Sequence, residues 1–261
     1  MIDLDYIRSF FPSSIAKNAN FQKHMLKEYI QLLVLDYLAN TPYISKLAFI
    51  GGTNLRLIKR IDRFSEDLDF DCKDMSKEEF MEMTDDVIRC LQREGLNAEA
   101  RNKENDKLKA FRRNIYFPEF LFEMGLTGHR DERFLLKMET QDQGVAYPRE
   151  NKNIQGCGFF FSIPTPPDAV LLSMKLAALL SRAKGRDFYD VMFLMQQTEP
   201  SFEFLSAVCD IKNARELKEA LMRKLQMVNL DMKKRDFEHL LFSANASERI
   251  LRFGEFINER L

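Results

Sequence analysis

Cysteine and histidine are scarce in this sequence, and neither type of residue is grouped. No cysteine pair has the spacing of metal ligands or of a redox motif, so we expect the reduced, buried cysteines of a cytosolic protein. The histidines lie far apart along the chain, which disfavours a zinc site built from them. The cysteines are Cys72, Cys90, Cys157 and Cys209, and the histidines are His24, His129 and His239.

A targeting signal and a long apolar run are also lacking. The N-terminal residues MIDLDYIRSFF have neither the basic start nor the long apolar core of a signal peptide. The longest apolar stretch, residues 169 to 180, is too short to span a bilayer and contains Lys175. We therefore expect a cytoplasmic protein that has no membrane partner.

Neither sign of charge dominates, since 39 Lys and Arg residues nearly balance 40 Asp and Glu residues. A net charge of −1 argues against a tail-like nucleic-acid binder but permits local patches. Residues 66 to 86 hold ten acidic residues against two lysines, whereas residues 101 to 113 hold six basic residues against two acidic ones. Such segregation is typical of solvated faces, although it can also mark a site.

The hydrophobic pattern predicts an α+β fold in two domains. A chain of 261 residues with 45% hydrophobic content is long enough to bury a sizeable core. Short alternating runs prevail from about residue 96 to 162, and helical spacing prevails after the sequence PTPPD at 164 to 168. We therefore expect a domain with a mixed sheet and flanking helices over residues 1–163, and a helical bundle over residues 164–261.

The predicted elements of the first domain are a helix at 20 to 39, a buried strand at 46 to 50, a strand at 67 to 72, a helix capped by Ser76 and ended by Gly95, strands at 96 to 102, 109 to 117, 133 to 140 and 156 to 163, and a short helix at 118 to 125. The predicted helices of the second domain span 168 to 183, 187 to 197, 213 to 228 and 232 to 260.

A glycine pair follows the first predicted strand. Gly51 and Gly52 let the backbone turn sharply and carry no Cβ that would block a close approach. Thr53 can cap the helix that follows, since its hydroxyl can accept a hydrogen bond from an early backbone N–H. The start of that helix presents free N–H groups and a positive dipole end, which suit a phosphate.

Acidic residues alternate with apolar ones in the strand that comes next. Asp67 and Asp69 lie on the same face of this strand, about 7 Å apart. Their oxygen atoms can converge on one or two divalent cations, with substrate phosphates completing the coordination. The alternative is that Asp67, Asp69 and Asp71 form the solvated face of an edge strand. The glycine turn upstream favours the metal site.

A third carboxylate and a lysine extend this candidate site. Glu139 lies in the predicted strand at 133 to 140, where Lys137 two residues away leaves a solvated face as an equal alternative. Lys175 lies in an apolar helical stripe, where an unpaired ammonium is costly to bury. Lys175 either reaches the edge of the core or pairs with a phosphate. Asp187 is either a helix cap or a site residue.

Taken together, these stretches resemble the AbiEii/AbiGii family of nucleotidyltransferase-like toxins. The resemblance rests on GGTNLRL, then RFSEDLDF, then MKLAALLSRAKGRDFYD, in that order, and it runs from about residue 20 to about residue 200. The family implies a nucleotidyltransferase fold of the DNA polymerase β type. Residues beyond 200 carry no matching motif.

The family's motifs assign roles to residues of the first domain. Gly51, Gly52 and Thr53 match its phosphate-binding turn, and Asp67 and Asp69 match its metal-binding aspartates. Thr53 replaces the serine that many polymerase β-type enzymes have, and its hydroxyl preserves the chemistry.

Further roles follow from the rest of the motifs. Lys175 matches the lysine expected on the nucleoside triphosphate, and Asp187 matches the acidic residue of the family's RD element. Ser65 lies in the segment R-x-S-x-D-x-D, whose first position is Arg63. Glu139 fits the third polymerase β-type carboxylate by its strand context.

The resemblance implies the toxin of a bacterial toxin–antitoxin pair, with a cognate antitoxin as its partner. Such an enzyme would use Mg²⁺ or Mn²⁺ to transfer a nucleotide from an NTP to an RNA acceptor such as tRNA. Two alternatives remain: a nucleotidyltransferase that modifies small molecules such as antibiotics, and a binding module that has lost turnover. Residues that could bind the acceptor are Arg182, Lys184 and Arg186, with the basic run at 101 to 113 as a second patch.

Overall fold

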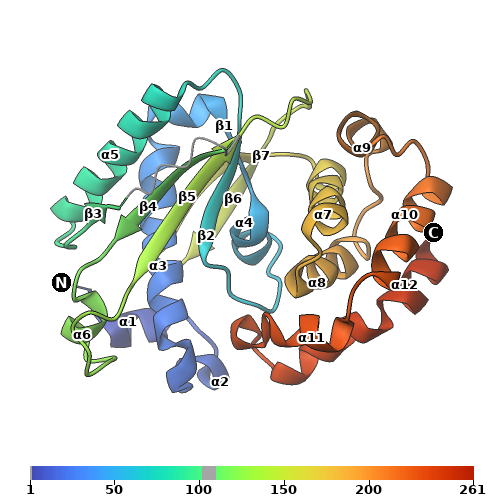
Figure 1. Ribbon diagram of the computed structural model, residues 1–261. Coiled ribbons are helices and arrows are strands. Elements are labelled where there is room, and N and C mark those ends of the chain that lie inside the picture. The colour runs from blue at the N-terminus through green and yellow to red at the C-terminus, as the bar shows by residue number, and fades with distance from the viewer. Residues whose placement is uncertain (1, 102–109) are drawn as a thin grey trace. The chain divides into compact units, whose positions relative to one another are not determined.

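The computed structural model describes residues 2–101 and 110–261, and contacts between residues divide the chain into two compact units (Figure 1). Two short segments that precede residue 166 already belong to the second unit. Unit 1 comprises Met1–Arg60, Phe64–Asp142 and Glu150–Thr165, and unit 2 comprises Ile61–Arg63, Gln143–Arg149 and Pro166–Leu261.

Unit 1 is built around a mixed sheet of five strands in the order β1-β2-β5-β4-β3. β2 and β5 are parallel, and all other neighbours in this sheet are antiparallel. The two strands that carry the predicted carboxylates are therefore direct neighbours at the centre of the sheet. The strands are β1 (Leu47–Ile50), β2 (Asp67–Cys72), β3 (Glu99–Ala100), β4 (Phe111–Tyr116) and β5 (Leu135–Gln141).

One face of this sheet is apolar and is covered by helices. Leu68 of β2 and Met138 of β5 are register partners, and both are fully buried. α5 (Lys77–Arg93) covers this face, with Phe80 packed on Phe111 of β4 at a ring-centroid distance of 5.9 Å. Ser76 caps α5 as predicted, since its side chain accepts from the backbone N–H of Glu79.

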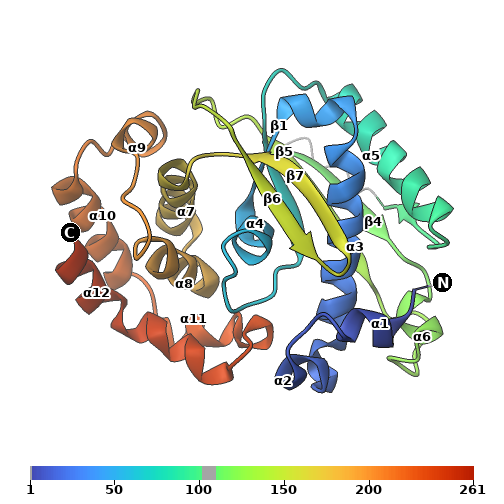
Figure 2. The ribbon, with the colours of Figure 1, turned by 180° about the vertical axis from the view of Figure 1, so that it is seen from behind.

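A second, two-stranded sheet also packs in unit 1, and Figure 2 shows it beside α3 (Gln22–Ala39). It is the hairpin of β6 (Glu150–Gly156) and β7 (Phe159–Thr165). Sequence analysis predicts β7 but not β6, because β6 is polar along most of its length and only Ile154 is fully buried. The remaining elements of unit 1 are α1 (Leu4–Arg8), α2 (Ser13–Ala16), η1 (Ala19–Phe21), η2 (Pro42–Lys46), α4 (Gly51–Leu57) and α6 (Phe120–Glu123).

Unit 2 is helical from α7 onward. The single helix predicted over 232 to 260 is wrong, because this stretch is divided into separate short helices. The backbone leaves the helical conformation at Phe237 and is extended at Ser243, and a separate helix begins after each of these residues. The elements are α7 (Asp168–Arg182), α8 (Gly185–Leu194), α9 (Phe202–Cys209), α10 (Ala214–Gln226), α11 (Leu230–Arg235), η3 (Glu238–Leu240), η4 (Ala244–Arg252) and α12 (Phe253–Arg260).

The core of unit 2 depends on close approach of α8 to its neighbours. A Cβ at Gly185 would lie 1.9 Å from the carbonyl oxygen of Lys233, so only glycine permits this contact between α8 and α11. Phe188 of α8 packs edge-on against Phe253 of α12 at 5.0 Å between ring centroids. The predicted fold class, an α+β chain with a mixed sheet followed by a helical bundle, is confirmed. Across the described residues, no helix has the length and apolar character needed to cross a membrane.

Candidate active site

The polar face of the central sheet brings the predicted carboxylates together by strand register. Asp69 of β2 is paired with Glu139 of β5, and Glu139 is paired in turn with Arg112 of β4. Two residues earlier on both strands, Asp67 is paired with Lys137. Because successive side chains of a strand point to opposite faces, all of these residues share one face of the sheet.

Lys137 lies between two of these carboxylates. Its ammonium nitrogen is 3.0 Å from Oδ2 of Asp67 and 2.9 Å from Oε2 of Glu139. The Nε of Arg112 donates to the other carboxylate oxygen of Glu139. We call Asp67, Lys137, Glu139 and Arg112 the sheet cluster. Its side chains are 19 to 41% exposed, so they are within reach of a ligand.

The charges of the sheet cluster stabilise one another. Burial alone would lower the pKa of Lys137, but the carboxylates of Asp67 and Glu139 outweigh it and raise that pKa. Burial alone would raise the pKa of Glu139, but Lys137 and Arg112 outweigh it and hold that pKa below its usual value. Glu139 is therefore an anion at neutral pH, held between two cations.

The predicted glycine turn lies directly against Asp69. Gly51 has φ +81°, a conformation that residues with a side chain rarely adopt. A Cβ at this position would lie 2.3 Å from Oδ2 of Asp69. The absence of a side chain at Gly51 therefore creates the space that the Asp69 carboxylate occupies. Gly52, the next residue of α4, is buried.

Thr53 does not cap the helix, contrary to the sequence-based expectation. α4 begins at Gly51, so Thr53 lies inside its first turn, and the N-cap residue Ile50 offers no side-chain hydrogen bond. The Thr53 hydroxyl instead donates to the backbone carbonyl of Asp67. Asn54, which sequence analysis does not single out, donates 2.7 Å to the carbonyl of Phe49. These two bonds hold the glycine turn against β1 and β2.

Ser65 lies in the buried segment that enters β2. Its backbone carbonyl accepts a hydrogen bond of 3.1 Å from the side chain of Gln31 on α3. Ser65 itself is buried. This contact fixes the position at which Asp67 starts the strand.

The oxygen donors of the sheet cluster fit a hard divalent cation. Carboxylates are the ligands that Mg²⁺ prefers in proteins. Oxygens of Asp67 and Glu139 already converge on one positive atom, the ammonium of Lys137, and Gly51 leaves room for the carboxylate of Asp69. Within the ranges that the structure describes, no three acidic, histidine or cysteine side chains are gathered closely enough to hold a metal as they stand. The ammonium occupies the place between the carboxylates.

Lys175 pairs with a carboxylate of the protein, an outcome that differs from both the core edge and the phosphate expected from the sequence. Its ammonium is 2.9 Å from Oδ2 of Asp190, one helix further along the chain. The guanidinium of Arg63 binds both oxygens of the same carboxylate, at 2.8 and 2.7 Å. We call Arg63, Lys175 and Asp190 the helix cluster. Asp190 is fully buried, and it is the residue of this cluster that the sequence analysis does not assign.

Electrostatic pairing keeps the helix cluster ionised. Burial alone would raise the pKa of Asp190, but Arg63 and Lys175 outweigh it and hold that pKa below its usual value. The exposed fractions are 1% for the Arg63 side chain, 0% for Asp190 and 9% for Lys175. This cluster therefore belongs to the interior of unit 2.

Asp187 is a structural partner at the start of α8. It is fully buried, accepts a hydrogen bond of 3.0 Å from the backbone N–H of Lys184, and binds the guanidinium of Arg182 through both carboxylate oxygens.

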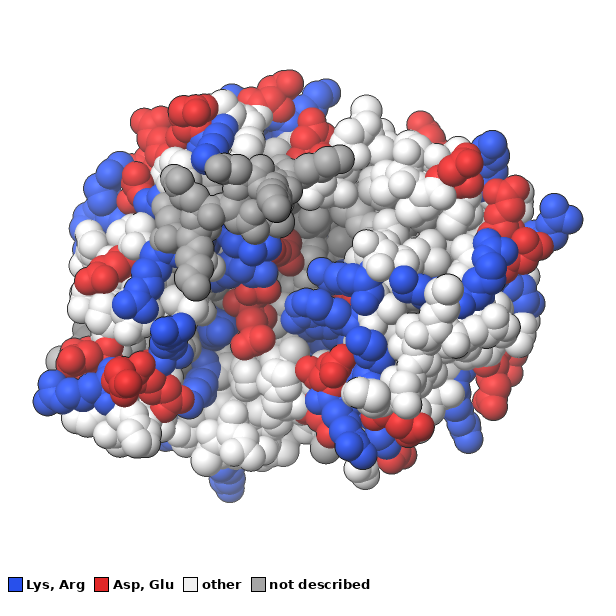
Figure 3. All heavy atoms as spheres, in the orientation of Figure 1, with Lys and Arg blue, Asp and Glu red and all other residues white. Residues whose placement is uncertain are grey.

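Two of the basic residues predicted to bind the acceptor reach the surface: Lys184 is exposed and Arg186 is partly exposed. In Figure 3, basic side chains gather over the part of unit 2 where α7 and α8 lie in Figure 1.

The second predicted basic patch, at 101 to 113, falls only partly within the described residues, because residues 102–109 lie outside them. At its end, Arg113 pairs with Asp85 of α5 while Arg112 pairs with Glu139. These two arginines therefore neutralise acids of unit 1 instead of forming a free basic surface.

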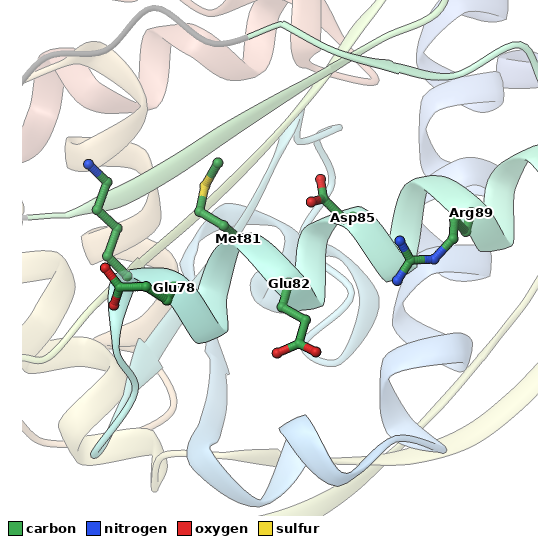
Figure 4. A pocket seen from close by; sticks show the side chains of 6 residues that line it. Glu78, Met81, Glu82, Asp85 and Arg89 are labelled. Carbon is green, nitrogen blue, oxygen red and sulfur yellow. The ribbon is translucent and has the colours of Figure 1, made fainter.

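A hollow of about 680 Å³ runs along α5, and Figure 4 shows the side chains that line it. They all come from this one helix, and none of them is a predicted site residue. The lining residues are Lys77, Glu78, Met81, Glu82, Asp85 and Arg89.

Three solved structures share this fold, and two of them are described as nucleotidyltransferases. MenT4, a nucleotidyltransferase toxin from Mycobacterium tuberculosis H37Rv, superposes with a TM-score of 0.61 at 17% identity, over 99% of this chain and 90% of its own. A Helicobacter pylori protein described as a "putative nucleotidyltransferase" gives a TM-score of 0.53 at 19% identity, over 90% and 93% of the two chains. JHP933 from Helicobacter pylori gives 0.52 at 19% identity over 90% of each chain. The fold is therefore that of the nucleotidyltransferases.

The family can be stated more narrowly than the fold. Residues 33–254 match the family model described as nucleotidyl transferase AbiEii toxin of type IV toxin–antitoxin systems. This match covers most of the chain, so the protein belongs to the AbiEii family of toxin nucleotidyltransferases, and the predicted resemblance is confirmed. A comparison with curated proteins found no match.

Proposed function

We propose that this protein transfers a nucleotidyl group from a nucleoside triphosphate to the 3′-hydroxyl of an RNA, with Mg²⁺ or Mn²⁺ held by the sheet cluster. The observation that carries the proposal is the register of β2 and β5, which sets Asp69 opposite Glu139 and puts Asp67 on the same face. Three carboxylates on one open sheet face supply the hard oxygen ligands that such cations need.

Each residue of this face has a distinct part in the proposal. Asp67 and Asp69 hold the cation, and Glu139 adds the third carboxylate. A divalent cation bound there would lower the pKa of the attacking hydroxyl and would neutralise negative charge on the departing pyrophosphate. Gly51 brings the backbone close to the bound triphosphate because it carries no side chain that would keep the two apart.

The turn at the start of α4 suits the phosphates. Its N-cap residue, Ile50, makes no side-chain hydrogen bond, and the first backbone N–H groups of a helix have no partner within the helix, so we assign these donors to the phosphates. Gly52 and Thr53 continue the same turn, and Ser65 leads into the strand that carries the aspartates. We assign these residues to nucleotide binding together with Gly51.

In unit 2 we assign Lys175 to catalysis and to binding of the triphosphate, and Asp187 to catalysis. Two cations share the one carboxylate of Asp190 in the helix cluster, so Lys175 could exchange part of this pairing for a phosphate oxygen. Arg182, Lys184 and Arg186 are assigned to the acceptor. Binding that relies on such a patch weakens steeply as salt rises.

Labelled nucleotides test this proposal directly. Purified protein is incubated with each α-labelled triphosphate, Mg²⁺ and total cellular RNA, and the label is followed into RNA. We expect label on an RNA species with the natural protein and none with the Asp67→Asn, Asp69→Asn double variant. Label that appears equally with both proteins would contradict the proposed site.

The same assay distinguishes the two alternatives. Label transferred to a small molecule such as an antibiotic, and never to RNA, would indicate the small-molecule class. Triphosphate binding without any transfer would indicate a module that has lost turnover. The toxin role is tested in cells, where we expect growth arrest when the protein is expressed alone and relief by an antitoxin encoded beside it.

A further inference from the structure

The position of Lys137 raises a question about how a cation enters the sheet cluster. Its ammonium lies within hydrogen-bond distance of Asp67 and of Glu139, at 3.0 and 2.9 Å. A divalent cation held by the same carboxylates would be bound at about 2.0 to 2.6 Å from their oxygens. The ammonium and the divalent cation would therefore need the same oxygen atoms.

The two positive groups cannot occupy this place together. Like charges at such short range repel strongly, and the carboxylate of Glu139 already shares its other oxygen with Arg112. Lys137 is also fixed to the site, because it is the register partner of Asp67 on the neighbouring strand. Its effective concentration at the carboxylates is therefore high.

We propose that Lys137 is a built-in competitor that fills the cation position of the sheet cluster and must move aside before a divalent cation binds. The residue keeps the carboxylates from repelling one another in the metal-free protein and weakens binding of the free metal ion. This inference rests on the proposed function, since it assigns the cation to these carboxylates.

Manganese binding in the absence of nucleotide tests this competition. Mn²⁺ is titrated into the natural protein and into Lys137→Met, which keeps the length of the side chain but removes its charge, and free Mn²⁺ is measured by electron paramagnetic resonance. We expect the dissociation constant of Mn²⁺ to fall about tenfold in Lys137→Met, because the charge-assisted contacts of the ammonium with Asp67 and Glu139 no longer have to be broken. An equal or higher dissociation constant would overturn the proposal.

Two matched variants show whether loss of the positive charge is what raises the Mn²⁺ affinity of Lys137→Met. Lys137→Arg keeps the positive charge, so it should bind Mn²⁺ as weakly as the natural protein does. Lys46→Met removes a lysine of the same unit that pairs with Glu79 at 2.7 Å and lies away from the cluster, so its Mn²⁺ affinity should not change. Equal gains in all three variants would overturn the proposal.

Thermal unfolding gives a second readout that does not depend on activity. In EDTA, Lys137→Met should melt about 2–4 °C below Lys46→Met, because its carboxylates lack the ammonium that separates them. Added Mn²⁺ should raise the melting temperature of Lys137→Met more than that of the natural protein. A smaller or equal rise would count against the competition, and Lys137→Gln repeats the comparison if the methionine variant does not fold.

Failure of this inference can be told apart from failure of the proposed function. If the natural protein transfers nucleotide with Mg²⁺ but Lys137→Met binds Mn²⁺ no more tightly, the competition is wrong and the function stands. If the natural protein transfers no nucleotide while Lys137→Met gains Mn²⁺ affinity, the competition stands and the proposed function is wrong.

Discussion

The sheet cluster and the helix cluster both pair lysine and arginine with carboxylates, yet they differ in exposure. Side chains of the sheet cluster are 19 to 41% exposed, whereas those of the helix cluster are at most 9% exposed. Ion pairs within reach of water exchange partners at lower cost than buried pairs do, because a buried charge that loses its partner stays out of water. The difference indicates that the sheet cluster is arranged for a ligand and that the helix cluster chiefly holds unit 2 together.

The sharpest test of this contrast removes the proposed metal ligands of β2, Asp67 of the sheet cluster and its neighbour Asp69. Asp67→Asn or Asp69→Asn should abolish Mg²⁺-dependent transfer, with a loss of roughly 1,000-fold or more, because several kcal/mol of transition-state stabilisation depend on the cation. Labelled-nucleotide transfer measures the loss, and thermal unfolding should stay near that of the natural protein. Full activity in either variant would remove these residues from the site.

The corresponding change in the helix cluster should act on stability. Asp190→Asn leaves Arg63 and Lys175 without their buried counter-charge and should lower the free energy of unfolding by about 3–5 kcal/mol. Asp210→Asn is the matched control in unit 2, because its pair with Lys212 is exposed and should contribute less than about 1 kcal/mol. Equal unfolding free energies for the two variants would contradict the structural role.

The pH dependence of this effect follows from the sign of the pKa shift. Because the pKa of Asp190 is lowered in the folded protein, its contribution is fully present above the unfolded value of about 3.9 and is lost as pH falls through the folded value. The difference in stability between the natural protein and Asp190→Asn should stay constant from about pH 8 to pH 5. It should shrink only below about pH 4, as denaturant titrations at each pH can show.

Alanine substitutions at Gly51 and Gly95 distinguish the effect of backbone strain from the effect of contact with Asp69. Gly51→Ala should cost about 1–3 kcal/mol of stability and also lower activity, because the new Cβ collides with the Asp69 carboxylate. Gly95 has nearly the same φ, +82°, but a Cβ there would have no atom within 4 Å, so Gly95→Ala should lose stability alone. A Gly51→Ala protein as active as Gly95→Ala would show that the contact has no catalytic importance.

Lys175→Met should have the smallest effect on stability, about 1 kcal/mol, because Arg63 still pairs with Asp190. If Lys175 contacts the triphosphate, the KM for the nucleotide should rise with little change in melting temperature. An unchanged KM would restrict Lys175 to the interior of unit 2.

Local patterns in the sequence were enough to predict much of unit 1. The strict alternation of β2 predicts its bounds, 67 to 72, and Ser76 predicts the start of α5. β6 escapes prediction because its polar sequence lacks that alternation. The long helix predicted at 232 to 260 is wrong because apolar spacing continues through Phe237 and Ser243, where the backbone leaves the helical conformation.

Prediction of the candidate site from the sequence is limited in the same way. Asp67 and Asp69 can be assigned from one strand, because the spacing of two residues determines which face they share. The roles of Lys137 and Asp190 depend on partners from other strands and helices, and a single sequence does not reveal register or helix packing. From the sequence, Lys137 indicates a solvated face as readily as a site. The structure instead sets its ammonium between two carboxylates.

The short segment Ile61–Arg63 has a consequence for the order in which the chain folds during synthesis. It leaves the ribosome with unit 1, yet Arg63 pairs with a residue 127 positions later and forms a bridge to Leu241. Until those late residues emerge, the arginine has neither of these partners. The segment that leads into β2 therefore belongs to a unit that is not yet complete. A nascent chain released near residue 165 would therefore carry an open segment between α4 and β2. Completion of the toxin fold waits for the last part of the chain to be made.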